Sequence, residues 1–294
     1  MSYKPSVAVI GSAGFIGGPL VEAFSRPDLK DKLQFPVKDK TSTSTIKYVE
    51  AELSESNVAK VVEELKGSDV IVSLLPPSPD TISVLESTLK QVKPKVYIPS
   101  QFGSDIRPAQ KNLPGFLKIK IDHSDNVRSF GVKVVEVVNS FFIGEGHFLT
   151  EIVGHVGIDA NTKTVTYAGS PQTKIAISYL PDVGNAVASL TSIEPSKLPD
   201  TVRIESDEVT YEDIAKKYEK DHGLTLQVKN ITAEELLKKA NDRIQTAKEF
   251  SLEDFLLYLW AVSVGGRDYG NSYSKNDDDL VNPGGKLFKW TKFH

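Results

Sequence analysis

The sequence predicts an α/β protein built on a Rossmann-type doubly wound parallel sheet, with a smaller C-terminal α+β domain. Three observations predict this fold. A glycine-rich turn directly follows an apolar run near the N-terminus. Apolar runs and helical patterns alternate through the first 140 residues. After Asn139 the sequence changes to shorter, irregular segments rich in aromatic residues and glycine.

The glycine-rich turn joins an apolar run at residues 7–10 to a helical pattern. A strand, a glycine-rich turn and a helix together present backbone N–H groups and a helix N-terminus to a pyrophosphate. The glycines follow the spacing GxxGxxG, which differs from the GxGxxG of most medium-chain dehydrogenases and is used by short-chain reductases with extended or atypical sites. The alternative is a close helix–strand contact without a ligand. The predicted dinucleotide-binding residues are Gly11, Ser12, Ala13, Gly14, Phe15 and Ile16.

The rest of the first 140 residues alternates between strands and helices. The helix after the turn ends at Pro27, and a helix capped by Ser54 ends at Gly67. The nearly continuous apolar run at residues 69–75 is typical of a parallel strand covered on both faces. Five alternating strands predict a ligand crevice at their C-terminal ends. The expected strands are residues 7–10, 33–37, 69–75, 95–98 and 132–138, and the later helices are residues 55–66, 79–92 and 117–130.

The second half predicts a domain assembled from short pieces. A strand is expected at residues 164–167, and capped helices at residues 210–220 and 233–248. An Ala/Val-rich helix after Tyr179 is expected to return to the first domain. We therefore expect a dinucleotide-binding domain at residues 1–140, with residues 175–200 returning to it, and a mainly substrate-binding domain at residues 141–294.

Composition excludes several classes of function. The chain has 294 residues and a formal net charge of −4, which argues against nucleic acid or an anionic membrane as the main partner. It has no cysteine, so disulfides, thiolate metal sites and cysteine nucleophiles are excluded. No metal-ligand spacing occurs among the five histidines, and the acidic run at residues 276–279 predicts a solvated turn. The longest apolar run, residues 255–264, is half of a membrane span. We expect a cytoplasmic monomer or homodimer that binds a small molecule.

Many short-chain reductases use a Tyr-x-x-x-Lys pair, and this sequence has none. The nearest match places Phe116 four residues before Lys120, so a phenyl group stands where the tyrosine would be. Lys120 therefore cannot assist a tyrosine at that position.

The combination of motifs resembles the isoflavone reductase-like, NmrA-related branch of the atypical short-chain dehydrogenases/reductases. The resemblance implies a Rossmann domain with a small C-terminal domain, NADPH as cofactor and Lys120 as the catalytic residue. Members of that family usually have the motif Pro-Ser-Glu-Phe-Gly, whereas this sequence has Gln101 in place of the glutamate. The replacement removes a negative charge near the nicotinamide and leaves the substrate preference open. The matching segments are residues 11–17, 72–75, 97–103 and 139–141, together with Lys120 eleven residues before Gly131. The further cofactor-binding residues that it implies are Leu75, Pro76, Ser100, Gln101, Phe102, Lys120, Asn139 and Phe141.

The chemistry of lysine agrees with a role for Lys120. Its ammonium can fix the ribose hydroxyls and can polarise or protonate an oxyanion that develops when hydride arrives. Partial burial would lower its pKa toward a useful range. The alternative is a surface lysine beside Lys118. His123, one turn further on, could share this face and relay a proton, or be a bystander.

The cofactor preference rests on Lys38-Asp39-Lys40, at the end of the predicted second strand. NADP enzymes place a base there for the 2′-phosphate, whereas NAD enzymes place an acid for the ribose hydroxyl. Lys38 stands where the resembling reductases carry arginine, and Lys40 could assist. Asp39 would oppose the phosphate only if it turned inward, so NADPH is the expected cofactor.

An aromatic segment after Asn139 predicts the substrate wall. Phe142 and His147 are the candidate substrate-binding residues, near Phe148 and His155. The alternative is that these side chains form the core of the domain junction.

The leading hypothesis is an NADPH-dependent reductase that transfers hydride to an aromatic or enone-like small molecule, with Lys120 as acid or electrostatic catalyst. The alternative is an NAD(P)-sensing NmrA-like regulatory protein that binds a protein partner without turnover. A third hypothesis is a quinone reductase in stress defence. Lys120 favours an enzyme, whereas Phe116 and Gln101 favour the sensor.

Overall fold

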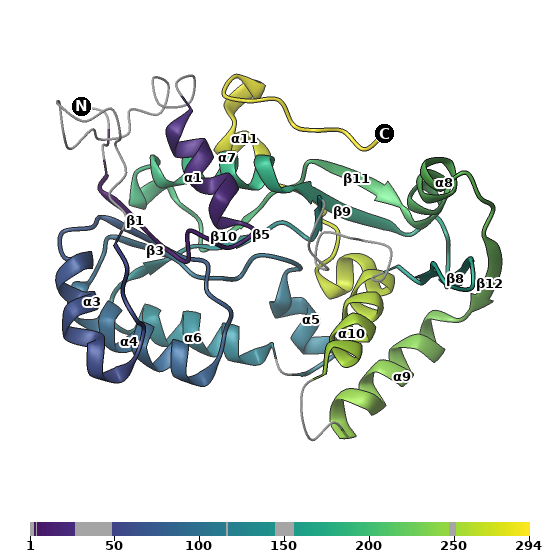
Figure 1. Ribbon diagram of the computed structural model, residues 1–294, viewed down its shortest axis with the longest axis horizontal. Coiled ribbons are helices and arrows are strands. Elements are labelled where there is room, and N and C mark those ends of the chain that lie inside the picture. The colour runs from purple at the N-terminus through teal and green to yellow at the C-terminus, as the bar shows by residue number, and fades with distance from the viewer. Residues whose placement is uncertain (1–2, 4, 27–48, 116, 145–155, 247–250) are drawn as a thin grey trace.

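The computed structural model describes residues 3, 5–26, 49–115, 117–144, 156–246 and 251–294. Its N-terminal part contains a parallel sheet with the strand order β1-β2-β3-β4. Helices cover both faces of this sheet, so the predicted Rossmann-type α/β fold is confirmed (Figure 1). The strands are β1 (Val7–Ile10), β2 (Val70–Ser73), β3 (Val96–Ile98) and β4 (Lys133–Val134). Helices α3 (Val58–Leu65), α4 (Pro79–Val92) and α6 (Lys118–Ser129) cover one face, and α1 (Gly17–Ser25) and α7 (Leu180–Thr191) cover the other.

These elements follow the sequence pattern closely. Strand β2 is buried at all four positions, as expected for a parallel strand between two helical layers. Helix α4 begins after Ser78, whose hydroxyl accepts a hydrogen bond from the backbone N–H of Thr81, and Pro79 occupies its first turn. The Ser54 cap predicted for the next helix is wrong, because Ser54 makes no side-chain capping bond; a short 3₁₀ turn, η1 (Glu55–Asn57), precedes α3 instead. The predicted strand at residues 33–37 lies outside the described residues.

The prediction of one continuous strand at residues 132–138 is wrong, because this run forms two separate strands. The N–H of Val135 still donates to the carbonyl of Tyr97 on β3, but the N–H of Glu136 donates to Asp200. The chain changes partner because β3 ends before Pro99, which has no N–H to continue a ladder. The second half of the run becomes β5 (Glu136–Val138), which pairs in parallel with β10 (Thr201–Arg203).

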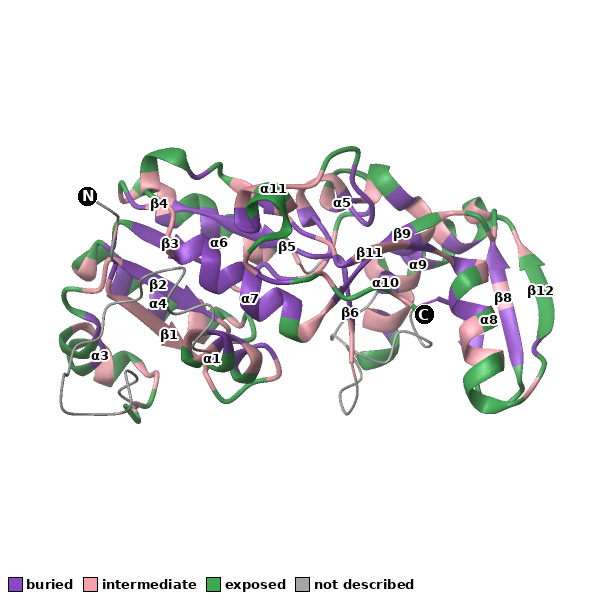
Figure 2. Ribbon diagram, turned by 90° about the horizontal axis from the view of Figure 1, so that it is seen from above, coloured by how far each residue is buried: buried purple, intermediate pink, exposed green. Residues whose placement is uncertain are grey.

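The C-terminal part forms a second core beside this sheet. Helix α8 (Tyr211–His222) begins at the predicted Thr210 cap, which forms a reciprocal capping box with Asp213, and it runs two residues beyond the predicted end at Lys220, to a left-handed C-cap at Gly223. Figure 2 shows that β8 is buried, whereas the edge strand β12 is exposed. One sheet has the order β11-β9-β6 and another the order β12-β8-β7. The remaining elements are β6 (Phe141–Ile143), β7 (Ile158–Asp159), β8 (Thr164–Ala168), β9 (Lys174–Tyr179), β11 (Asp207–Thr210), β12 (Gln227–Ile231), α9 (Ala233–Thr246), α5 (Ile106–Asn112), α10 (Leu252–Gly265), α11 (Asp278–Val281), η3 (Pro195–Lys197), η4 (Gly266–Tyr269) and η5 (Pro283–Gly285).

The acidic run at residues 276–279 is not the solvated turn that its composition predicts. Asp277 accepts a hydrogen bond from the backbone N–H of Arg203 at 2.8 Å, and Asp278 accepts one from Glu205 at 3.1 Å. Burial raises the pKa of Asp278 to about 7. These carboxylates therefore attach the C-terminal segment to the end of β10.

None of the helices in the described part of the chain is both long and apolar enough to cross a membrane.

Helix α7 packs directly against α1, although more than 150 residues separate them. A Cβ atom at Gly184 would lie 2.5 Å from the carbonyl oxygen of Pro19 on α1. Only glycine permits this approach, which brings a helix from the second half onto the first sheet. The division of the chain into domains at residue 140 stays a prediction.

We expect Gly184→Ala to lower the free energy of unfolding by roughly 1–3 kcal/mol, because the added methyl group forces the two helices apart. Gly18→Ala is the matched control, since a Cβ atom at Gly18 on α1 would have no neighbour within 4 Å. It should be neutral or stabilise the protein by up to about 1 kcal/mol. Urea unfolding measures both. Equal midpoints for the two variants would contradict the close contact.

Candidate active site

The three glycines of the N-terminal turn have different structural roles. Gly11 has φ +88°, and a Cβ atom there would lie 3.2 Å from Cδ2 of Leu75. A Cβ atom at Gly17 would lie 2.5 Å from the carbonyl of Ser12. Gly14 is exposed, and its Cβ atom would meet only the carbonyl oxygen of Gly11, at 3.5 Å. Packing within the protein explains Gly11 and Gly17 but not Gly14, whose missing side chain leaves the loop open from outside.

The N-terminus of α1 lies at the end of this loop. Its capping residue, Ile16, makes no side-chain hydrogen bond to the helix, and no acidic residue occurs in the first turn. The partial positive charge of the helix end is therefore not neutralised by an acidic side chain of its own first turn. This is the electrostatic setting that favours an anion.

The loop also contacts the candidate substrate wall. The rings of Phe15 and Phe142 pack edge to face, with their centroids 5.2 Å apart. Phe142, Ile16 and Phe102 are buried in the core around the first sheet, whereas Phe141 is buried in the C-terminal core. The two adjacent phenylalanines of β6 thus point into different cores.

Five of the predicted residues line one narrow cleft at the C-terminal ends of β2 and β3. Its volume is about 20 Å³, which is room for about one water molecule. The position agrees with the crevice expected for a doubly wound sheet. The predicted residues in the lining are Leu75, Pro76, Ser100, Gln101 and Lys120, and sequence reasoning missed Ser73, Pro77, Thr81, Ile82, Leu85, Tyr97 and Pro99.

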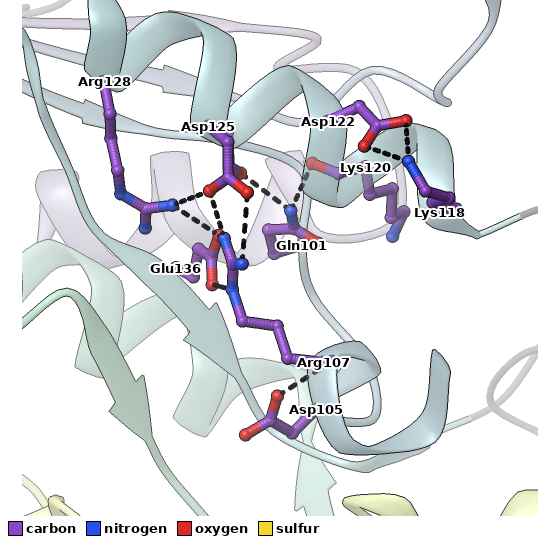
Figure 3. A network of polar contacts seen from close by, with 10 residues as sticks. Gln101, Asp105, Arg107, Lys118, Lys120, Asp122, Asp125, Arg128 and Glu136 are labelled. Atoms are coloured by element: carbon purple, nitrogen blue, oxygen red, sulfur yellow. Dashed lines mark hydrogen bonds and ion pairs between the residues drawn. The ribbon is translucent and has the colours of Figure 1, made fainter. Parts of the chain in front are cut away.

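Lys120 lies in the first turn of α6 and is half-buried. Within the described residues its amine makes no hydrogen bond or ion pair, and burial lowers its pKa to about 8. Lys118 differs, because it is exposed and pairs with Asp122 at 2.5 Å (Figure 3). The surface-lysine alternative therefore describes Lys118 and not Lys120.

Gln101 connects the loop after β3 to the first turn of α6. It is only 2% exposed, and its Nε2 donates to the carbonyl of Lys120 at 2.7 Å and to Oγ of Ser124 at 2.8 Å (Figure 3). A carboxylate has no N–H to donate, so the glutamate that is usual in the resembling family could not bond the carbonyl of Lys120, although it could accept a hydrogen bond from Ser124. Gln101 Oε1 is buried in the same cleft without a partner among the described residues, and Ser73 Oγ is buried there beside the hydroxyl of Tyr97.

His123 also lines the cleft, and both of its ring nitrogens are hydrogen-bonded. Nε2 lies 2.9 Å from the hydroxyl of Tyr97, and Nδ1 lies 3.0 Å from Oε1 of Glu86. Burial lowers the pKa of His123 and raises that of Tyr97. His123 is therefore part of a buried polar chain and not a bystander on the helix surface.

Asn139 holds the loop after β3 from the other side. Its Oδ1 accepts from the N–H of Gly103 at 3.0 Å, and its own N–H donates to the carbonyl of Gly103 at 3.0 Å. Ser140 follows with φ +54°, an uncommon conformation for a residue with a side chain. Asn139 thus fixes the loop that carries Ser100 and Gln101, whereas its contact with a cofactor stays a prediction.

A network of charges holds α6 against β5. Arg107 on α5 forms two hydrogen bonds to the buried carboxylate of Glu136, at 3.0 and 2.7 Å. Arg107 and Arg128 also pair with Asp125 on α6, at 2.7 Å each (Figure 3). The hydrogen bond from Arg107 holds the pKa of the Asp125 carboxyl group below its usual range. Sequence reasoning missed this network, because its members are up to 29 residues apart.

Three predicted positions, Lys38, Phe116 and His147, lie outside the described residues. The 2′-phosphate contact, the tyrosine position and part of the substrate wall therefore stay predictions. Among the described residues, no three His, Asp or Glu side chains are arranged to hold a metal ion.

Because the pKa of Lys120 is lowered from 10.5 to about 8, the lysine destabilises the fold while it is protonated. We expect Lys120→Met to raise the free energy of unfolding at pH 7 by roughly 1–3 kcal/mol, since each pKa unit corresponds to about 1.4 kcal/mol. Between pH 8 and 10.5 the unfolded wild type binds more protons than the folded one, so the wild type gains stability and the difference shrinks.

Chemical unfolding at a series of pH values measures this difference, with the exposed Lys118→Met as control. Lys118→Met should show no such trend. A difference between Lys120→Met and the wild type that stays constant from pH 8 to 10.5 would contradict the burial of an uncompensated amine.

Comparison with solved structures identifies proteins that share this fold. The chain is similar to an isoflavone reductase, with a TM-score of 0.69, 17% identity and coverage of 95% of both chains. It is also similar to the leucoanthocyanidin reductase–NADPH complex from Vitis vinifera, with a TM-score of 0.64, 17% identity and coverage of 95% of this chain and 94% of the other. A nucleoside-diphosphate-sugar epimerase from Staphylococcus aureus gives a TM-score of 0.62 at 15% identity, with coverage of 98% and 97%. At these identities the likeness shows the shared fold.

Among curated proteins, none matches this sequence significantly. The NmrA-like family matches residues 3–256, which include the glycine-rich loop, the Lys120 cleft and most of the C-terminal core. This match confirms the resemblance that the sequence motifs indicate. The chain belongs to the NmrA-like family.

Proposed function

We propose that this protein is an NADPH-dependent reductase that transfers hydride to a small aromatic or enone-like molecule, with Lys120 as the acid. The observation that carries this proposal is the half-buried amine of Lys120, without a paired carboxylate in the described residues, in the cleft at the strand ends. Structural likeness to the NADPH complex of a leucoanthocyanidin reductase supports the cofactor. Solubility in the cytoplasm and a monomeric or dimeric state belong to the same proposal.

The residues around the cleft fit a dinucleotide. The open face at Gly14 and the end of α1 would receive the pyrophosphate, and Lys38 would bind the 2′-phosphate. Gln101 Oε1, which has no partner among the described residues, lies where a polar ring substituent could reach it. When bound, NADPH supplies the hydride. The proposed cofactor-binding residues are Gly11, Ser12, Ala13, Gly14, Phe15, Ile16, Lys38, Leu75, Pro76, Ser100, Gln101, Phe102, Lys120, Asn139 and Phe141, and Phe142 and His147 are proposed to face the substrate.

Lys120 would donate a proton to the oxyanion that forms on the substrate. With a pKa of about 8, its amine is mostly protonated at pH 7 and loses its proton more easily than an ordinary lysine. Loss of the proton also removes a charge from a desolvated position, which favours donation. No carboxylate in the described residues competes for the ammonium.

A regulatory NAD(P)-binding protein without turnover is the second candidate. Gln101 favours it, because the usual glutamate of the resembling enzymes is replaced by a residue whose bonds hold the backbone of α6. The buried amine of Lys120 favours the enzyme, since a sensor has no need for a destabilising lysine at this position.

We expect Gly14→Val to weaken NADPH binding by about 100-fold or more, because the branched side chain would occupy the space in front of the loop. Gly14→Ala should weaken it less. Fluorescence titration measures the affinity. The thermal midpoint should stay within a few degrees of the wild type, because the added Cβ atom meets only Gly11. Unchanged affinity in a folded Gly14→Val variant would show that the loop is only a structural turn.

We expect the wild type to oxidise NADPH, in preference to NADH, with at least one member of a panel of enones, quinones and phenolic ethers. Lys120→Ala should lower kcat by a factor of about 10² or more and change the Kd for NADPH by less than about tenfold, because a positioned acid acts mainly in the transition state. Lys118→Ala is the control and should keep the wild-type rate.

Two negative results of this experiment would lead to different conclusions. No NADPH oxidation by the wild type across the panel, with NADPH binding intact, would support the regulatory protein. Turnover of Lys120→Ala at the wild-type rate would overturn the catalytic assignment alone.

A further inference from the structure

A buried polar chain connects the cleft of Lys120 to the protein surface. It consists of Tyr97 on β3, His123 on α6 and Glu86 on α4. The Tyr97 hydroxyl lies 2.9 Å from Nε2 of His123, whose Nδ1 lies 3.0 Å from Glu86 Oε1. The side chain of Glu86 is 20% exposed, and its second oxygen accepts from Asn126 on the surface of α6. The chain therefore has one end in solvent and the other inside the protein.

The inner end of this chain opens into the cleft. Tyr97, His123 and Lys120 all line it, and so do Ser73 and Gln101. Gln101 Oε1 is buried there without a partner among the described residues, Ser73 Oγ lies beside the hydroxyl of Tyr97, and each of the two residues is at most 2% exposed. A buried water requires two to four polar partners and a cavity of roughly 10–15 Å³. The cleft, at about 20 Å³, meets both requirements.

An acid in this position needs a route for its next proton. After Lys120 gives a proton to a substrate, a neutral amine remains. Within the described residues no ionised side chain pairs with that amine, so it has no charged neighbour from which to recover the proton. Among the described residues of the cleft, Tyr97 and His123 form a continuous hydrogen-bonded chain that reaches the surface through Glu86.

We propose that Tyr97, His123 and Glu86 form a proton relay that recharges Lys120 through one water molecule bound in the cleft. This relay rests on the proposed reductase function. The bound water gives a proton to the amine of Lys120 and takes the hydroxyl proton of Tyr97. Glu86 takes a proton from solvent and passes it to Nδ1 of His123, and the oxygen of Tyr97 takes the proton of His123 Nε2. One solvent proton thus reaches Lys120, and no electrons move.

The relay differs from a purely structural chain in its effect on successive turnovers. The first turnover uses the proton that Lys120 already carries and needs no relay. Every later turnover waits until Lys120 is recharged. Loss of a structural hydrogen bond would instead distort the cleft and slow all turnovers equally.

Stopped-flow measurement of NADPH oxidation, with the substrate found in the screen above, separates the two roles. In Tyr97→Phe we expect a burst of one NADPH per active site at the wild-type rate, followed by turnover slowed about tenfold or more. Glu86→Gln should behave alike, because an amide keeps a hydrogen bond to His123 but has no acidic proton to pass on. The control is Tyr211→Phe, which removes another buried hydroxyl, bonded to Ser263 in the C-terminal core, and should match the wild type in both phases.

Equal slowing of both phases in Tyr97→Phe, or slowing of neither, would overturn the relay while leaving the reductase intact. Absence of NADPH oxidation by the wild type would instead remove the reductase. A wild-type crystal structure that resolves water tests the cleft without turnover. We expect a water bonded to the Tyr97 hydroxyl and to Ser73 Oγ, and a dry cleft would overturn the relay.

Discussion

The desolvation of Lys120 without a paired carboxylate is the constraint on which the rest of the site depends. A protonated amine in such a place is unfavourable, so its surroundings must hold it there. The neutral amide of Gln101 does this by donating to the carbonyl of Lys120 and to Ser124, which fixes the helix turn without adding a charge. A glutamate in place of Gln101 would lose the bond to the carbonyl of Lys120, because a carboxylate has no N–H to donate, and would add a negative charge to the cleft. The departure from the usual family pattern is therefore consistent with a lysine tuned by burial alone.

The fold holds α6 from two sides. Gln101 contacts it from the loop after β3, and Asn139 fixes that loop through Gly103. On the other side of the helix, Arg107 joins Asp125 to the buried carboxylate of Glu136. The charges of this network thus lie on the side of α6 that faces β5, while the side chains that line the cleft around Lys120 are neutral polar or apolar groups. This separation allows a low pKa for Lys120 in a helix that is otherwise rich in ion pairs.

Much of the fold and part of the site could be predicted from local sequence. Apolar runs located β1, β2 and β3, prolines located the start of α4 and the Thr210 cap located α8, because these signals act within a few residues. The break between β4 and β5 could not be predicted, since it depends on pairing with β10, more than 60 residues later. The hydrogen-bonded chain from Tyr97 through His123 to Glu86 could not be predicted for the same reason, because its contacts join residues that are 26 and 37 positions apart. The role of Gln101 follows only from the two acceptors that the fold brings to it.

The most direct test of this account is an NMR titration of the Lys120 amine in protein labelled with ¹⁵N-lysine, assigned by the loss of its signal in Lys120→Met. The account predicts a titration midpoint near 8 in the wild type. In Gln101→Glu the midpoint should move up toward the ordinary lysine value, because an added carboxylate stabilises the ammonium. A wild-type midpoint near the ordinary value of about 10.4 would contradict the central claim, since Lys120 would then be solvated or paired.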